Sequence, residues 1–280
     1  MNRKRIAGVA AGVIGLGGLA SLSPGITAHA LPPSVTVTNT AAGAAPSASA
    51  EATCPAGSAL VGTGGKITGG AGQVVMTDVI PNVAAGTVTV WGVEKVAFAG
   101  AWSVSAYAVC DAQIANVVRV GVASPLNGNS PKTVNPMCPA NKVLTGVGYQ
   151  LLNANGQVFP NQVTPNAALN GAQISATASA GFGGAWSLTG YAICATVPAG
   201  AAPQRVALAG PINMASPKSV TTPVCQAGKD LVGLGGELVG GAGNVILDQI
   251  TPNAQLTSAT TRGNAFAPAN WGVIAYGVCW

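Results

Sequence analysis

The sequence predicts an all-β protein of three tandem, pseudo-equivalent units, β-sandwich or β-prism-like in kind and each closed by one disulfide. Three observations carry this prediction. The six cysteines fall into three pairs of nearly equal spacing, and the same landmark residues recur between the members of each pair. Turn residues also interrupt the chain before any helical apolar period is established.

The N-terminal segment has the order of a secretory signal peptide. Residues 3–5 are Arg-Lys-Arg, residues 6–22 are largely apolar, and Ala28-His29-Ala30 offers a small-residue cleavage site. We therefore expect residues 1–30 to be removed, the mature chain to begin near Leu31, and the protein to be secreted and extracellular. An uncleaved membrane anchor is the alternative, which the closely following proline and cleavage site oppose. We expect no transmembrane segment after signal removal.

The composition of the mature chain narrows the possible chemistry. Nine Lys and Arg stand against seven Asp and Glu, which gives a net charge of +2 once the three basic residues of the signal are gone. These cations are scattered singly, so nucleic acid is not an expected partner. The single histidine, His29, leaves with the signal, which excludes Ser-His-Asp catalysis and the usual zinc sites. We expect no cofactor and no metal.

Cysteine spacing divides the mature chain into three units. Two pairs span 56 positions and one spans 54: Cys54 to Cys110, Cys138 to Cys194, and Cys225 to Cys279. This pairing is the simplest of 15 connectivities, and by the chain-entropy model each bridge contributes about 3 to 4 kcal/mol. With the repeated segments upstream of each first cysteine, the units are residues 31–112, 113–198 and 199–280.

The first landmarks of each unit predict a turn that leads into a strand. The segment after the first cysteine reads Cys-Pro-Ala-Gly, Cys-Pro-Ala-Asn or Cys-Gln-Ala-Gly. Glycine exchanges only with asparagine at its last position, which predicts a positive φ there, at Gly57, Asn141 and Gly228. Leucine follows six residues after the cysteine, and glycine eight and ten residues after it.

The later landmarks predict a second turn and a central strand. A Pro-Asn pair 27 residues after each first cysteine predicts a tight turn, at Pro81-Asn82, Pro165-Asn166 and Pro252-Asn253. Tryptophan stands eight residues before each second cysteine, at Trp102, Trp186 and Trp271. Alternation places each tryptophan, two small residues and the cysteine on one face, where ring and disulfide would fill a core. The other face is partly apolar too, so this strand should be central or face a neighbouring unit.

In the middle unit these signals predict six strands, near residues 118–123, 132–136, 142–152, 157–163, 171–178 and 185–195. The Pro125-Leu126-Asn127-Gly128 segment predicts a hairpin between the first two of them. The glycine-rich runs at 69–72 and 240–243 predict hairpin tips. They lack the Lys-Ser/Thr and the helix of a phosphate loop.

Two repeated residue sets are candidate ligand-binding groups. Tyrosine recurs three residues before each second cysteine, and asparagine recurs in each Pro-Asn pair, which gives Tyr107, Tyr191, Tyr276, Asn82, Asn166 and Asn253. Burial of the tyrosines against a neighbouring unit and ordinary turn chemistry of the asparagines are the alternatives. We expect no catalytic residue. The only tempting pair of acids is Asp78 and Glu94, and the middle unit contains no acid.

The assembled motif is Cys-Pro-Ala-Gly, Gly-x-Gly-Gly, Pro-Asn and Trp-Ser-Val-Ser-Ala-Tyr-Ala-Val-Cys. It resembles a module of secreted proteins from high-GC Gram-positive bacteria, and the resemblance covers all three units. Threefold repetition of short β units with a Cys-Pro start is also similar to β-prism proteins of extracellular coats and lectins. Neither resemblance carries over a site residue.

We expect a secreted, non-catalytic structural or interaction protein at the cell surface or in the extracellular space. Its partner would be cell-wall glycan or another surface protein. The alternative is a lectin-like protein that binds glycan or cell wall at up to three equivalent sites, which requires exposed aromatic and asparagine side chains in the same place in each unit. A small-substrate hydrolase is the third hypothesis.

Overall fold

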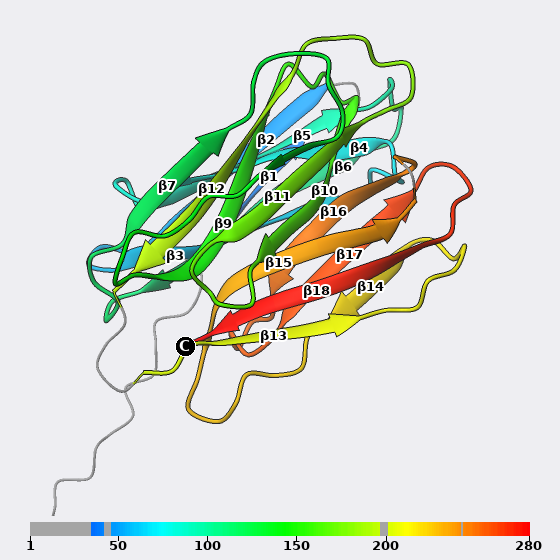
Figure 1. The fold of residues 1–280 in the computed structure, drawn as a ribbon. Coiled ribbons are helices and arrows are strands. Elements are labelled where there is room, and N and C mark those ends of the chain that lie inside the picture. The colour runs from blue at the N-terminus through cyan, green and yellow to red at the C-terminus, as the bar shows by residue number, and fades with distance from the viewer. Residues whose placement is uncertain (1–34, 42–45, 197–200, 242) are drawn as a thin grey trace, which may run out of the picture. The chain divides into compact units, whose positions relative to one another are not determined.

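The computed structural model describes residues 35–41, 46–196, 201–241 and 243–280, with the main chain alone for 35–41 (Figure 1). The predicted signal peptide, residues 1–30, lies outside the described residues. Within these ranges, no helix has the length and apolar character that crossing a membrane requires. The predicted all-β fold class is confirmed.

The strands of the described residues form three six-stranded antiparallel sheets. The first sheet has the order β1 (Val35–Ala41), β6 (Trp102–Asp111), β3 (Ala59–Thr68), β16 (Val245–Pro252), β17 (Ala259–Ala265), β14 (Lys218–Thr221). The second has the order β13 (Gln204–Ala209), β18 (Trp271–Cys279), β15 (Leu231–Gly240), β10 (Val158–Pro165), β11 (Ala172–Ala178), β8 (Lys132–Val134). The third has the order β2 (Ser47–Thr53), β5 (Thr87–Glu94), β4 (Val74–Asn82), β9 (Val143–Leu152), β12 (Ser187–Ala195), β7 (Val118–Ala123).

Each sheet takes three strands from one sequence unit and three from another. Each unit therefore supplies half of two different sheets, and its two halves pack face to face as a β-sandwich. In the first unit, the ring of Trp102 on β6 packs against Gly92 on β5, and Gly65 on β3 packs against Met76 on β4. The units are thus β-sandwiches whose sheets continue into both neighbours, which closes the repeat on itself instead of leaving a linear array.

The three predicted disulfides are present, and each ties together the two layers of one sandwich. In every unit the first cysteine follows the outermost strand of one sheet, and the second lies at the end of a strand of another sheet. The bonded pairs are Cys54–Cys110, Cys138–Cys194 and Cys225–Cys279, each with a Cα–Cα distance of 5.7 Å. Three such bonds indicate folding in an oxidising compartment.

Most local predictions for the middle unit are confirmed. All six strands are present within a few residues of their predicted bounds. The positive φ predicted after each first cysteine is found, at Gly57 (86°), Asn141 (65°) and Gly228 (82°). The tryptophan face of the last strand is buried, and this strand lies between two neighbours in all three sheets, as predicted for a central strand.

The predicted hairpin at residues 125–128 is wrong, and so are the hairpin tips predicted at residues 69–72 and 240–243, because the strands on either side of each segment lie in different sheets. Strand β7 pairs with β12 in the third sheet, whereas β8 pairs with β11 in the second. The segment between them crosses from one layer of the sandwich to the other. Alternation identifies a strand and its buried face, but it does not identify the strand's partner, so it cannot show whether strands adjacent in sequence share a ladder.

The Pro-Asn pairs also lie differently from the prediction. Pro81 and Pro165 belong to strands β4 and β10, and the turn begins after them. In the middle unit, Asn166 Oδ1 accepts the Asn170 N–H (3.1 Å), and Leu169 adopts a φ of 52°. The proline therefore ends the strand, and the asparagine side chain closes the loop that follows.

The repeated glycines lie where the three units meet. Strands β3, β9 and β15 contact one another, and each carries a β-bulge directly before its first repeated glycine. A Cβ atom on Gly233 would lie 1.9 Å from the carbonyl oxygen of Thr145, and one on Gly62 would lie 1.9 Å from that of Val232. Glycine is required here because the main chain of one unit touches the bulge of another.

Candidate functional site at the seams between units

The units join edge to edge at three equivalent seams, which we name by their paired strands: β4–β9, β10–β15 and β16–β3. Each seam is a short ladder of two residue pairs. One pair in each seam is polar: Asp78 with Gln150, Gln162 with Glu237, and Gln249 with Lys66. A β-bulge precedes each polar pair, at Thr77, Asn161 and Asp248. Equivalent positions therefore carry different chemistry in the three seams.

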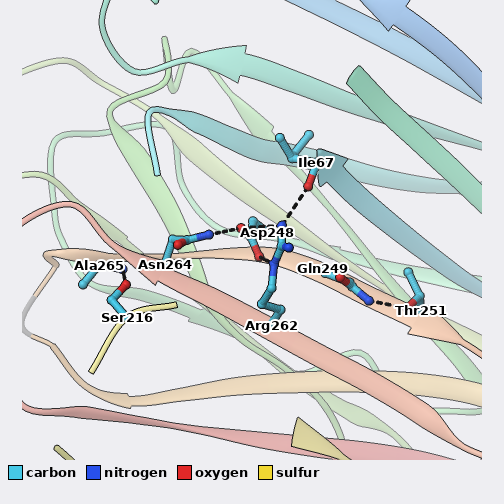
Figure 2. Close-up of polar contacts among 8 residues, drawn as sticks. All are labelled: Ile67, Ser216, Asp248, Gln249, Thr251, Arg262, Asn264 and Ala265. Atoms are coloured by element: carbon cyan, nitrogen blue, oxygen red, sulfur yellow. Dashed lines mark hydrogen bonds and ion pairs between the residues drawn. The ribbon is translucent and has the colours of Figure 1, made fainter. Parts of the chain in front are cut away.

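The β16–β3 seam is closed by an internal ion pair (Figure 2). Arg262 on β17 donates to both carboxylate oxygens of Asp248 at 3.0 Å and to the carbonyl oxygen of Ile67 across the seam, also at 3.0 Å. Asn264 donates to the same carboxylate. Burial raises the pKa of Asp248, and the bonds from Arg262 and Asn264 oppose that rise. Arg262 thus occupies this seam and neutralises the charge of the Asp248 carboxylate.

At the β10–β15 seam, the acid is hydrogen-bonded to a tyrosine of its own unit. The Tyr276 hydroxyl donates to Glu237 Oε2 at 2.7 Å. Burial, together with this carboxylate, raises the pKa of Tyr276 to about 12. A cavity of about 120 Å³ lies beside this seam and includes Asn161 among its lining residues. Among the described residues, the buried Asn161 Oδ1 has no hydrogen-bond partner.

The β4–β9 seam opens into a groove of about 350 Å³. Trp91 on β5 is the direct cross-strand neighbour of Asp78 on β4, and its side chain is 38% exposed. Asp78 Oδ1 accepts the Leu151 N–H (3.0 Å), and Oδ2 accepts the Thr77 hydroxyl (2.8 Å). The groove is lined by Pro46, Ser47, Thr77, Asp78, Trp91, Val93, Leu151, Asn153, Ala154 and Asn155.

Burial dominates the ionisation of Asp78 and raises its pKa to about 6, against two hydrogen bonds that lower it. Among the described residues, no Lys or Arg forms an ion pair with this carboxylate. Burial raises the pKa values of Tyr149 and Tyr191, and the charge of Asp78 adds a smaller rise to both. Asp78 is therefore a largely buried carboxyl group that meets an open groove without a neutralising partner.

The three predicted tyrosines lie at equivalent positions, but they differ in exposure. Tyr191 and Tyr276 are buried, and Tyr107 is half-buried. The Tyr191 hydroxyl donates to Gln150 Oε1 (3.1 Å), and the Arg119 guanidinium stacks on the Tyr191 ring at 4.9 Å. Arg205 stacks in the same way on Tyr276, at 4.5 Å. In these two units, neighbouring side chains therefore engage both the ring and the hydroxyl of the tyrosine.

The predicted asparagines use their side chains to close their own loops. Asn82 Oδ1 accepts the Ala85 N–H (3.2 Å), and Asn253 Oδ1 accepts the Thr257 N–H (2.7 Å), as Asn166 does in the middle unit. The tyrosine and the asparagine of one unit lie in different sheets. Tyr191 instead shares a sheet with Asn82 of the preceding unit, where Arg119 donates to the Pro81 carbonyl oxygen (2.6 Å).

The three repeated tryptophans form part of the core, as predicted, with at most 2% of each exposed. Two of them carry a buried lysine over the ring, Lys132 on Trp186 and Lys218 on Trp271, each at 4.8 Å. Burial lowers the pKa of both lysines. In the first unit, Glu94 instead accepts the indole N–H of Trp102 at 3.0 Å.

Asp78 and Glu94 do not come together as a pair of acids. Trp91 faces the groove beside Asp78, and Glu94 lies three residues further along β5, so its side chain points to the opposite face of the sheet. There it accepts hydrogen bonds from the Phe98 N–H and from Trp102. The described residues contain no group of three His, Cys, Asp or Glu side chains that could hold a metal ion.

Trp91 is the site residue that sequence reasoning missed, because it has no counterpart among the repeated tryptophans. The residues at the same ladder position in the other two units, paired with Gln162 and Gln249 as Trp91 is paired with Asp78, are Ser175 and Arg262. A signal was nevertheless present in the segment Thr87-Val-Thr-Val-Trp91, where alternation puts the tryptophan on the threonine face and not on the valine face. An aromatic ring on the polar face of a strand indicates exposure.

The fold and the seams together define the class: a three-unit β-sandwich protein whose sheets pass from unit to unit and whose units are closed by disulfides. No protein-family model matches this sequence, and no curated protein matches it.

Asp78→Asn is expected to make the protein more stable near pH 8 by about 2 kcal/mol. The folded-state pKa of about 6 exceeds the ordinary value of 3.8, so folding favours the protonated acid. The stability that this acid contributes is complete below pH 3.8 and is lost as pH rises through 6. Tyr149 and Tyr191, the titratable neighbours, stay protonated throughout this window.

The measurement is the free energy of urea unfolding of both proteins from about pH 4 to pH 8. The advantage of the variant should disappear at the acidic end of the range. A variant that is less stable than the wild type at both ends would show that Asp78 stabilises the fold as a carboxylate.

Proposed function

We propose that this chain is a secreted, non-catalytic structural or interaction protein that acts at the cell surface or in the extracellular space. The observation that supports this proposal best is the linkage of the three sandwiches. Every unit shares sheets with both neighbours, and a disulfide joins its two layers. Local opening of one unit would break the seams that join it to both other units, so such a body should resist unfolding and proteolysis outside the cell.

The distribution of polar groups supports a binding or structural role over catalysis. The Asp248 carboxylate is neutralised by Arg262, and Glu94 accepts two hydrogen bonds from its own unit. These acids hold the fold together. The partner we propose is cell-wall glycan or another surface protein, in keeping with the resemblance to secreted proteins of high-GC Gram-positive bacteria.

Expression of the full chain in a secreting Gram-positive host tests this role. We expect the protein in the medium or cell-wall fraction, cleaved after Ala30, with all six cysteines oxidised and with resistance to trypsin under non-reducing conditions. Fractionation, N-terminal sequencing and thiol labelling give the three readouts. Retention of the uncleaved chain in the cytosol, with free thiols, would overturn the proposal.

A further inference from the structure

We propose that the groove at the β4–β9 seam is a saccharide-binding site. In this site Trp91 stacks on a sugar ring, and the Asp78 carboxylate accepts hydrogen bonds from the hydroxyl groups of the sugar. This proposal names a ligand for the interaction role described above and rests on that role. It departs from a threefold lectin, because only one of the three seams has this arrangement among the described residues.

The comparison of equivalent positions carries the proposal. At the β16–β3 seam, the position of Trp91 is held by Arg262, whose guanidinium is bonded to Asp248 and Ile67. The polar groups of that seam are therefore hydrogen-bonded to one another. At the β4–β9 seam the described residues supply a ring and a carboxyl group, and none of them bonds the carboxylate as Arg262 bonds Asp248, so the groove that they line is open.

The lining chemistry matches a sugar. One face of a pyranose is a patch of C–H groups that packs on an aromatic ring, while its hydroxyl groups need acceptors and donors at the edge. Trp91 supplies the ring, and the carboxylate of Asp78 has lone pairs beyond the two hydrogen bonds that it already accepts. The exposed Asn153 and Asn155 also line the groove, and within the described part of the chain neither side chain has an internal hydrogen-bond partner.

The groove is also preformed. Asn153 and Asn155 belong to the loop that crosses from β9 in the third sheet to β10 in the second, where both hold a positive φ, of 60° and 47°. The Gln157 N–H donates to the Ala154 carbonyl oxygen (2.7 Å), and the Gln157 side chain donates to the carbonyl oxygen of Lys95 in the first unit (2.7 Å). A loop that is already held in one conformation loses less conformational entropy when a ligand binds.

Size and polarity separate a saccharide from other ligands. A volume of about 350 Å³ lies at the small end of the range for ligand sites. The mixture of Ser, Thr, Asp and Asn around a single indole is too polar for a lipid or another apolar ligand. The uncompensated carboxylate of Asp78 would repel the phosphates of a nucleic acid. A small organic cation could also satisfy the ring and the carboxylate, and the experiment includes it.

The experiment titrates the mature protein with chitotetraose, cellotetraose, mannotetraose and maltotetraose, and separately with choline, by isothermal titration calorimetry. Tryptophan fluorescence gives a local readout in a Trp280→Phe background, because Trp91 is exposed, the three repeated tryptophans are buried, and the half-buried Trp280 has been removed. We expect one of the tetrasaccharides to bind and to protect Trp91 from acrylamide quenching. Trp91→Ala and Asp78→Asn should each weaken this binding by about tenfold or more.

Two matched controls lie outside the groove. Glu51→Gln removes an exposed acid from the neighbouring strand β2, and Leu126→Ala removes an exposed apolar side chain from another loop; both should bind the sugar as the wild type does. Circular dichroism checks that each variant is folded. Binding by none of the four sugars, binding unchanged in Trp91→Ala, or binding of choline in their place would overturn the saccharide site. The secreted structural role is decided independently by the fractionation experiment.

Discussion

Replacement of Gly233 by alanine is expected to destabilise the protein by at least about 3 kcal/mol. The added Cβ would lie 1.9 Å from the carbonyl oxygen of Thr145. That oxygen belongs to the main chain of a β-bulge in another unit, so no side-chain rotation can relieve the overlap. Either the β9 bulge or the β15 strand must move, and both lie where the three units meet.

The matched control is Gly183→Ala. A Cβ at Gly183 meets no atom within 4 Å, and the residue is exposed, so its replacement should change the free energy of unfolding by less than about 0.5 kcal/mol. Urea unfolding followed by circular dichroism measures both variants under one set of conditions. Equal stability of the Gly233 and Gly183 variants would show that the close approach of the two main chains is not a constraint on the fold.

Loss of one disulfide is expected to have the second large effect. The double replacement of Cys138 and Cys194 by alanine removes a bond that closes a loop of 56 positions, and the chain-entropy model assigns such a bond about 4 kcal/mol. Because the bond ties two layers of the middle sandwich, both the second and the third sheet should lose stability together.

The measurement compares unfolding of the wild type and the double variant, each with and without a reducing agent. The reductant should lower the stability of the wild type further than that of the variant, because the wild type retains one more bond. An unchanged unfolding midpoint in the variant would mean that shared ladders alone hold the middle unit.

How much of this fold could be predicted depended on the range over which each signal acts. The positive φ at Asn141 and the Trp186 strand face were predictable, because a turn conformation and a period of two are local properties. The partner of β7 was not, because alternation fixes a face and not a neighbour. The same limit hid the exchange of half-sheets between units, in which β4 pairs with β9 across a unit boundary.

The candidate site was less predictable than the fold. Tyr191 and Asn166 are predicted as site residues because they recur in every unit. In the structure they have structural roles that every unit shares, in packing and in loop closure. The groove lies instead where the units differ, at the positions of Trp91 and Arg262. A residue that differs between the units can be interpreted only when the strand register shows which positions are equivalent.

The all-β class, the three disulfide pairs and the buried tryptophans are predictable from the amino-acid sequence, because residue spacing and strand alternation are local properties of the chain. The tertiary structure was needed to show that Gly62 and Gly233 meet the main chains of other units, and that Asp78 and Trp91 share a groove with the β9–β10 loop of the next unit. The physical reason is that these contacts join separate units. They depend on how the half-sheets pair across the seams, which no local pattern records.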